Sequence, residues 1–303
     1  MAVIHSRLAG WNSDAGTHDL LTSFCVGRGM SIPHRSADVK SFSSRLVHRK
    51  PSSTGNFVMC GRFTLKTPSA SLAEHFLLPG IPQLSARFNI APTQLVLCIR
   101  SVSPDSVTRE AATLRWGLIP SWAKDPSVGA RMINARSETA AEKPAFRHAY
   151  KSQRCIIPAD GFYEWQKTAA RTKQPWYIHR EDAQVIGFAG LWDSWSSKES
   201  DESIQSCTIL TTQANDDLRE LHERMPVILP EENYDAWLSL AASPGQLQSL
   251  MQPMQDGILT CYPVDKLVNK VANDVPECMQ QVAVHFVDEP PEKPRDRQRT
   301  LFD

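Results

Sequence analysis

The 303-residue sequence has no long apolar run and no excess of charge of either sign. No stretch approaches the roughly 18 apolar residues that a membrane-spanning helix requires, and the N-terminus lacks the compact apolar core of a secretory signal. Basic and acidic residues number 33 each, so nucleic acid could bind only through a local basic face. We expect a protein without membrane association, and a monomer.

The sequence also has few cysteines, and none of them forms a CxxC pair. Their number, seven, is odd, which suits a reducing compartment better than a disulfide framework. We therefore expect a cytoplasmic protein with mostly buried free thiols. Histidines and cysteines lack the paired spacing of metal ligands, so we expect no metal and no cofactor.

Residues 1–58 have no sustained apolar periodicity. They contain ten serines, five arginines, two lysines and three aspartates but no glutamate, so they cannot readily bury a core. Three interpretations remain open: an organellar transit peptide, a disordered regulatory tail, or sequence upstream of the true start at Met59, which we favour. The Pro-rich, charged residues 288–303 are expected to form a disordered tail.

Residues 59–287 have the pattern of one globular domain. Helical spacing predicts helices over 69–76, 216–225 and 231–240, and apolar segments predict strands over 95–99, 112–116 and 154–158. Residues 159–161 indicate a turn and 162–165 the returning strand, with Phe162 and Glu164 on one face and Tyr163 and Trp165 on the other. We expect an α+β fold built on a mostly antiparallel, barrel-like sheet with a few peripheral helices.

Four polar residues lie where a core would not require them. Glu164 lies in an aromatic strand, where burial would raise the pKa of its carboxyl towards that of a proton shuttle; alternatively it points to solvent from an edge strand. His222 is either a catalytic group or a hydrogen-bonded core histidine. Asn134 and Arg136 share one face and suit a carbonyl or sugar and a phosphate, or they belong to a polar strand edge.

Cys60 follows a methionine that could start the chain. If translation begins at Met59 and the methionine is removed, Cys60 carries a free α-amine beside its thiol. Such a 1,2-aminothiol condenses with an aldehyde to an imine, and the thiol then closes a thiazolidine ring.

Six motifs occur together in order: Met59-Cys60-Gly61-Arg62-Phe63, Phe88-Asn89-Ile90-Ala91-Pro92, Trp116-Gly117-Leu118-Ile119-Pro120, Ile133-Asn134-Ala135-Arg136-Ser137-Glu138-Thr139, Asp160-Gly161-Phe162-Tyr163-Glu164-Trp165 and His222-Glu223-Arg224-Met225-Pro226. In these motifs, over residues 59 to about 285, the chain resembles the SOS-response-associated peptidase (SRAP) family of abasic-site processing proteins. The resemblance implies a bacterial, nucleoid-associated DNA-damage sensor that acts on single-stranded DNA.

The resemblance also implies roles for individual residues. Cys60 would crosslink to the aldehyde of the abasic sugar, Glu164 would move protons, His222 would assist ring opening and strand-cleaving elimination, and Asn134 would position Cys60 and the sugar. The expected DNA-binding residues are Arg62, Asn89, Trp116, Trp122, Arg136 and Thr211. The two tryptophans would stack on bases, although one of them could equally be a core aromatic.

Other functions stay open. An intact leader would deprive Cys60 of its amine, which is restored by initiation at Met59 or by autoproteolysis before Cys60. A thiol peptidase would use Cys60 with His222 and no DNA, and a simple single-strand binder would not need the thiol. The C-terminal Gln298, Leu301 and Phe302 resemble a bacterial sliding-clamp-binding pentapeptide, so the clamp is a further expected partner.

Overall fold

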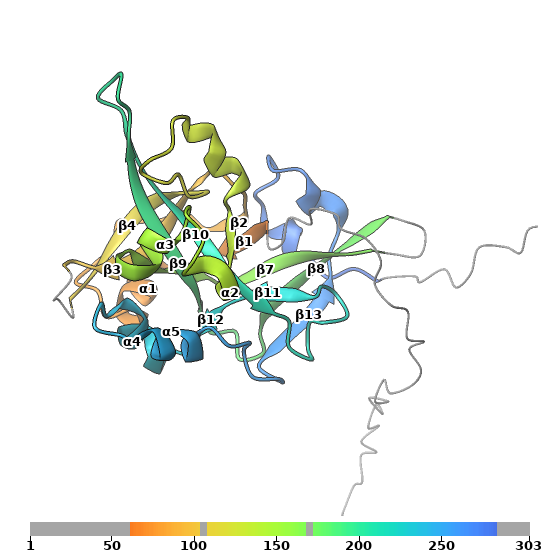
Figure 1. Ribbon diagram of the computed structural model, residues 1–303. Helices are drawn as coiled ribbons and strands as arrows, with labels where there is room; N and C mark the ends of the chain where they lie inside the picture. The colour runs from red at the N-terminus through yellow and green to blue at the C-terminus, as the bar shows by residue number, and fades with distance from the viewer. Residues whose placement is uncertain (1–60, 104–107, 168–171, 284–303) are drawn as a thin grey trace, which may run out of the picture. The chain divides into compact units, whose positions relative to one another are not determined.

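Five strands close into a barrel at the centre of the fold (Figure 1). Their order is β10-β4-β3-β6-β9, and β10 also pairs with β9, which closes the circle. The strands are β3 (Leu95–Ser101), β4 (Arg109–Trp116), β6 (Arg154–Ala159), β9 (Ile186–Ser196) and β10 (Ser203–Gln213). All pairs in the circle are antiparallel except β4 with β10. Shorter strands extend this sheet: β5 (Asn134–Arg136), β11 (Arg224–Pro226) and β12 (Ile228–Leu229).

A second, antiparallel sheet has the order β13-β8-β7-β1-β2. Its strands are β1 (Arg62–Leu65), β2 (Arg87–Ile90), β7 (Gly161–Lys167), β8 (Lys173–Arg180) and β13 (Leu259–Pro263). The computed structural model describes residues 61–103, 108–167 and 172–283. Cys60, the leader 1–58 and the tail with Gln298, Leu301 and Phe302 lie outside these residues.

Short helices lie around the two sheets, so the predicted α+β fold on a mostly antiparallel, barrel-like sheet is confirmed. They are α1 (Ser69–His75), α2 (Ser137–Ala140), α3 (Arg147–Ser152), α4 (Tyr234–Leu238), α5 (Pro244–Leu250) and the 3-10 helices η1 (Pro126–Arg131), η2 (Glu231–Asn233), η3 (Lys266–Asn269) and η4 (Pro276–Met279). In the described part of the chain, no helix has the length and apolar character to cross a membrane.

Alternation along β7 divides its side chains between two cores, as the period-two pattern predicts. Phe162 belongs to the large core that fills the barrel and the space between the sheets. Tyr163 belongs to a small core with Tyr177 and Cys278, against which Trp165 packs. Because side chains two apart on a strand share a face, Glu164 lies on the same face of β7 as Phe162. The buried carboxylate therefore belongs to the face that packs against the large core.

Two local predictions are wrong. Residues 159–161 do not turn the chain back into a hairpin, because β6 pairs with β3 and β9 in the barrel whereas β7 pairs with β1 and β8 in the other sheet. Residues 216–225 do not form a helix: 216–221 form hydrogen-bonded turns, and Met225 belongs to β11, which pairs with β10. In both places, pairing with distant strands overrides the local pattern.

Candidate functional site

Glu164 lies in the middle of β7 and is 4% exposed. Strand β7 pairs with β1, and Tyr163, the residue before Glu164, is the partner of Arg62. Arg62 is the first residue of β1 and follows Cys60 by two positions. The buried carboxylate therefore adjoins the end of β1 that is nearest to Cys60.

His222 lies between the turns of 216–221 and strand β11, and its ring is half-buried. Its Nδ1 accepts a hydrogen bond from the backbone N–H of Arg224 at 3.2 Å, so the neutral ring carries its proton on Nε2. Burial lowers the pKa of His222, and the nearby cations Arg224 and Lys167 lower it further, against the opposing charge of Glu223. The ring is therefore neutral at pH 7.

The segment that carries His222 faces the Glu164 side of β7. Gln166, two residues after Glu164 and on the same face of the strand, donates from Nε2 to the carbonyl oxygen of Glu220 at 3.5 Å. This contact places the turn that precedes His222 next to the strand that carries Glu164.

Asn134 and Arg136 begin and end β5, which pairs with β10 in parallel. Asn134 is partly buried and Arg136 is exposed. The indole of Trp116 donates to the carbonyl oxygen of Ile133 at 2.9 Å, and its ring packs edge-on against Phe63 of β1 with centroids 5.1 Å apart. Trp116 therefore joins the start of β5 to β1.

Trp116 itself is fully buried, which corrects its expected role as a base-stacking platform. A ring enclosed on both faces by the core has no surface for a base. Trp122, by contrast, is 64% exposed, and its indole donates weakly to the carbonyl oxygen of Pro144 at 3.4 Å. Of the two tryptophans, Trp116 thus has the core role, and base stacking by Trp122 stays a prediction.

The loop that carries Trp122 is held at several backbone positions. Ser121 N donates to a carboxylate oxygen of the buried Asp193 at 3.0 Å, and Ile119 N donates to Ser206 Oγ at 2.7 Å. The indole of Trp195 donates to the carbonyl oxygen of Ala123 at 2.7 Å. These bonds to β9 and β10 fix the backbone on both sides of the exposed ring.

Arg224 and Glu138 form a bidentate ion pair that sequence reasoning missed. Arg224 Nη1 and Nη2 donate to the two carboxylate oxygens of Glu138 at 2.8 and 2.9 Å, and Nη2 also donates to the carbonyl oxygen of Thr211 at 2.6 Å. The pair connects the backbone beside His222 to α2, which follows Arg136. Both residues lie inside the six motifs quoted above. Only their contact in the folded protein indicates that they link the segment beside His222 to α2.

Thr211 is 2% exposed, and its hydroxyl donates to the carbonyl oxygen of Ala135 at 3.4 Å. The expectation that Thr211 binds DNA is therefore corrected: its side chain stabilises the pairing of β5 with β10.

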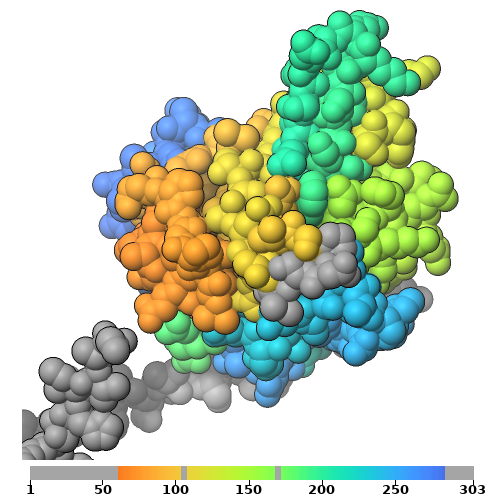
Figure 2. Space-filling model, turned by 90° about the vertical axis from the view of Figure 1, so that its left-hand side faces the viewer, coloured from red at the N-terminus to blue at the C-terminus, as the bar shows by residue number. Residues whose placement is uncertain are grey.

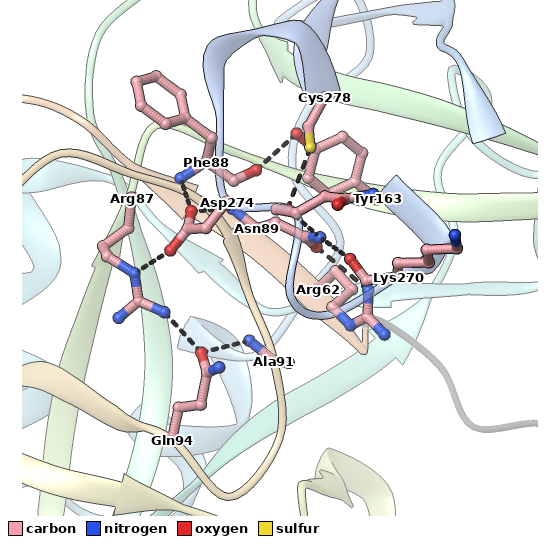
Figure 3. Close-up of polar contacts among 11 residues, drawn as sticks. Arg62, Arg87, Phe88, Asn89, Ala91, Gln94, Tyr163, Lys270, Asp274 and Cys278 are labelled. Carbon is pink, nitrogen blue, oxygen red and sulfur yellow. Dashed lines mark hydrogen bonds and ion pairs between the residues drawn. The ribbon is translucent and has the colours of Figure 1, made fainter. Parts of the chain in front are cut away.

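Arg62 and Asn89 belong to a polar network that attaches the segment 264–279 to β1 and β2 (Figure 3). Asn89 is fully buried and donates from Nδ2 to the carbonyl oxygens of Val268, Lys270 and Asn273. Arg62 Nη1 donates to Asn89 Oδ1 at 3.1 Å and to the carbonyl oxygen of Val268 at 2.8 Å. Asn89 is thus a structural residue, which corrects its expected contact with DNA.

Asp274 anchors the same segment to β2. Its carboxylate accepts from the backbone N–H groups of Phe88 at 2.5 Å and Asn89 at 2.9 Å and pairs with the guanidinium of Arg87. Although partial burial alone would raise the pKa of Asp274, these donors together lower it below its ordinary value. The half-buried Arg62 is held by this network with its guanidinium near the ring of Trp165.

A cavity of about 450 Å³ lies elsewhere on the molecule, lined by His75, Arg180, Glu231 and Tyr234 among others. None of the expected site residues lines it. Within residues 61–103, 108–167 and 172–283, no group of three or more histidine, cysteine, aspartate or glutamate side chains could hold a metal ion.

The closed barrel, the second sheet and the buried Glu164 on the strand that pairs with β1 define a class of α+β barrel proteins. Residues 59–271 match the model of the SOS response associated peptidase (SRAP) family, and the chain belongs to this family.

Relatives are similar over most of the domain. The abasic site processing protein YoqW of Bacillus subtilis is 42% identical over 226 residues, which cover 73% of this chain and 99% of YoqW. The abasic site processing protein HMCES of Xenopus tropicalis is 33% identical over 201 residues, 59% of each chain. A crystal structure of a protein from Bacteroides thetaiotaomicron matches with a TM-score of 0.66 and 27% identity, covering 74% of this chain and all of that chain.

Proposed function

We propose that the protein processes abasic sites in single-stranded DNA by forming a thiazolidine crosslink through Cys60. Membership of the SRAP family and relatives named abasic site processing proteins support abasic-site processing. The observation that supports the covalent mechanism is the buried Glu164 on β7, the strand that pairs with β1 directly after Cys60, with the turn before His222 in contact with Gln166 of β7. A site for proton transfer at this position suits a reaction at the α-amine and thiol of that cysteine.

The reaction requires Cys60 to be the first residue of the mature protein. The ring-opened abasic sugar presents an aldehyde, and attack by the α-amine forms a carbinolamine that loses water to give an imine. The thiol sulfur then adds to the imine carbon, and the thiol proton passes to the nitrogen. One C–N and one C–S bond replace the C=O bond, whose oxygen leaves as water.

The neighbouring residues divide the proton transfers between them. Glu164 gives a proton to the departing oxygen and recovers it from the thiol, and burial away from water favours such an exchange. His222, neutral with its proton on Nε2, assists opening of the sugar ring and can accept a proton during elimination of the 3′ phosphate from the imine. Asn134 orients the sugar, Arg136 contacts a flanking phosphate and Trp122 stacks on a base.

The rate of adduct formation tests these roles. Glu164→Gln is isosteric but cannot exchange the proton, so adduct formation with an abasic single strand should slow by about 10²–10⁴-fold. Cys60→Ser should lose the stable adduct yet keep an amine that forms a transient imine, which borohydride traps by reduction. If Glu164→Gln reacts at the rate of the unchanged protein, the role of the carboxylate is refuted.

A thiol peptidase that uses Cys60 and His222 is the competing function. It predicts cleavage of peptide bonds, including the bond before Cys60, at a rate that abasic DNA does not alter. Adduct formation with abasic strands but not with intact strands distinguishes the crosslinking function from it.

A further inference from the structure

Three exposed cations follow one another at four-residue intervals along the turn 143–146 and the helix α3 (Arg147–Ser152). Lys143, Arg147 and Lys151 are spaced four residues apart, and Arg147 N donates to Lys143 O at 2.9 Å, so the helical turn before α3 continues into it. Residues four apart on a helix share a face. All three side chains are exposed, whereas Ala149, about half a turn from both Arg147 and Lys151, is buried.

These three cations, which we term the basic stripe, are available to an external anion. In the described part of the chain none of them forms an ion pair. The carboxylate of Glu138 is engaged by Arg224, and Glu142, in the turn between α2 and α3, forms no ion pair with the stripe in the described part of the chain. A helix face that is only exposed to water does not need three cations at four-residue intervals, whereas a site that binds several phosphates does.

The basic stripe starts beside the candidate site. Glu138, in α2, is fixed to Arg224, and Lys143 N donates to the carbonyl oxygen of the next residue, Thr139, at 3.0 Å. Pro144, directly after Lys143, accepts the weak hydrogen bond from the Trp122 indole. In Figure 2 this yellow-green segment forms an exposed bulge beside the base of the β9–β10 arm.

We propose that the basic stripe binds the backbone phosphates of single-stranded DNA that leaves the reacting site, with Trp122 stacking on a base at its start. The proposal rests on the proposed function and adds a binding surface for the strand outside the abasic nucleotide. A row of positive charges and an exposed aromatic ring are the elements of sequence-independent single-strand binding. Phosphate contacts position the strand without reading its sequence.

The test compares two double variants with the same chemical change. Lys143→Gln/Lys151→Gln removes two charges of the stripe, and Lys66→Gln/Lys198→Gln removes two exposed lysines elsewhere. Glutamine has nearly the helix propensity of lysine, so the fold should persist; urea unfolding checks this. Binding of an intact strand of about 15 nucleotides, which spans one typical single-strand site, is measured by fluorescence anisotropy at several salt concentrations.

Each phosphate contact contributes a slope of about −0.7 to log K against log salt for single strands. The stripe variant should therefore have a slope about 1.4 less steep than the unchanged protein. Its affinity deficit should shrink about sevenfold between 50 and 200 mM salt, because a fourfold change raised to the power 1.4 is about seven. The Lys66→Gln/Lys198→Gln control should keep the original slope.

A stripe variant with the slope and affinity of the control overturns the proposal. Crosslinking to a short strand, with one nucleotide on each side of the abasic site, should proceed equally in all three proteins, because such a strand lacks the further nucleotides that the proposal places on the stripe. If the unchanged protein forms no adduct even with long abasic strands, the proposed function fails, whatever the salt slopes are.

Discussion

Replacing Asn89 by alanine is expected to detach the segment 264–279 from β1 and β2. The amide of Asn89 has two N–H groups, which three carbonyl oxygens share at 2.7–3.1 Å: those of Val268, Lys270 and Asn273. Its oxygen accepts from Arg62 at 3.1 Å. Figure 3 shows this amide at the centre of the network.

The expected cost follows from these bonds. Two neutral hydrogen bonds contribute about 1 kcal/mol each, and a bond to a charged group contributes about 1.5–3 kcal/mol. The carbonyl oxygen of Val268 keeps a donor in the variant, because Arg62 also bonds to it at 2.8 Å, and the half-buried Arg62 can regain water. We therefore expect Asn89→Ala to lower the free energy of unfolding by about 3–4 kcal/mol.

Urea unfolding measures this loss, with Asn269→Ala as the matched control. Asn269 lies in the same segment but is exposed, and its side-chain oxygen accepts one hydrogen bond, from Trp165 at 2.7 Å. The control should lose about 1 kcal/mol or less, and the urea m value should stay the same in both variants. Equal losses in Asn89→Ala and Asn269→Ala would refute the structural role of Asn89.

Three further predictions concern the site. Asp193→Ala should lower stability by about 2 kcal/mol through the lost acceptor and weaken single-strand binding, whereas Asp193→Asn keeps an acceptor; unchanged binding in the alanine variant would show that the Trp122 loop does not need this anchor. Trp122→Ala should weaken binding of an intact strand by about 1–3 kcal/mol in anisotropy measurements, and Trp122→Phe should retain most of the affinity; equal affinities would exclude stacking. Lys167→Gln removes a positive charge that lowers the pKa of His222, so the pKa of the ring should rise. Because the adduct rate falls when the ring is protonated, the acid limb of the pH–rate profile, where the rate drops at low pH, should move to higher pH. Lys173→Gln should leave the limb in place, and an unmoved limb in Lys167→Gln would refute the coupling.

Local periodicity sufficed for the elements that local contacts decide. The predicted helix 69–76 corresponds to α1, and the strands 95–99 and 112–116 correspond to the paired β3 and β4. The alternation of Phe162 and Tyr163 between two cores also followed from the strand period. The strand predicted over 162–165 is part of β7, but the hairpin turn 159–161 and the helix 216–225 were misassigned because pairing with strands far away in the sequence decides these segments.

The site was predictable only where a residue type contrasts with its surroundings. Glu164 stands out as a carboxylate in an aromatic strand, and His222 as a histidine next to Leu221 shortly before Pro226. The structure places the turn before His222 against β7. No comparable signal separates Trp116 from Trp122, since burial depends on the loop that Asp193 holds. The Arg224–Glu138 pair joins two motifs that lie far apart in the sequence, so only the fold reveals it.

The intact mass of the purified protein, before and after incubation with an abasic single strand, tests the central claim most directly. The account predicts a mature chain that starts at Cys60 and a stable adduct whose mass is that of protein plus DNA minus one water. It also predicts no adduct with the intact strand. A mature chain starting at Cys60 that gains no mass from the abasic strand would contradict the account.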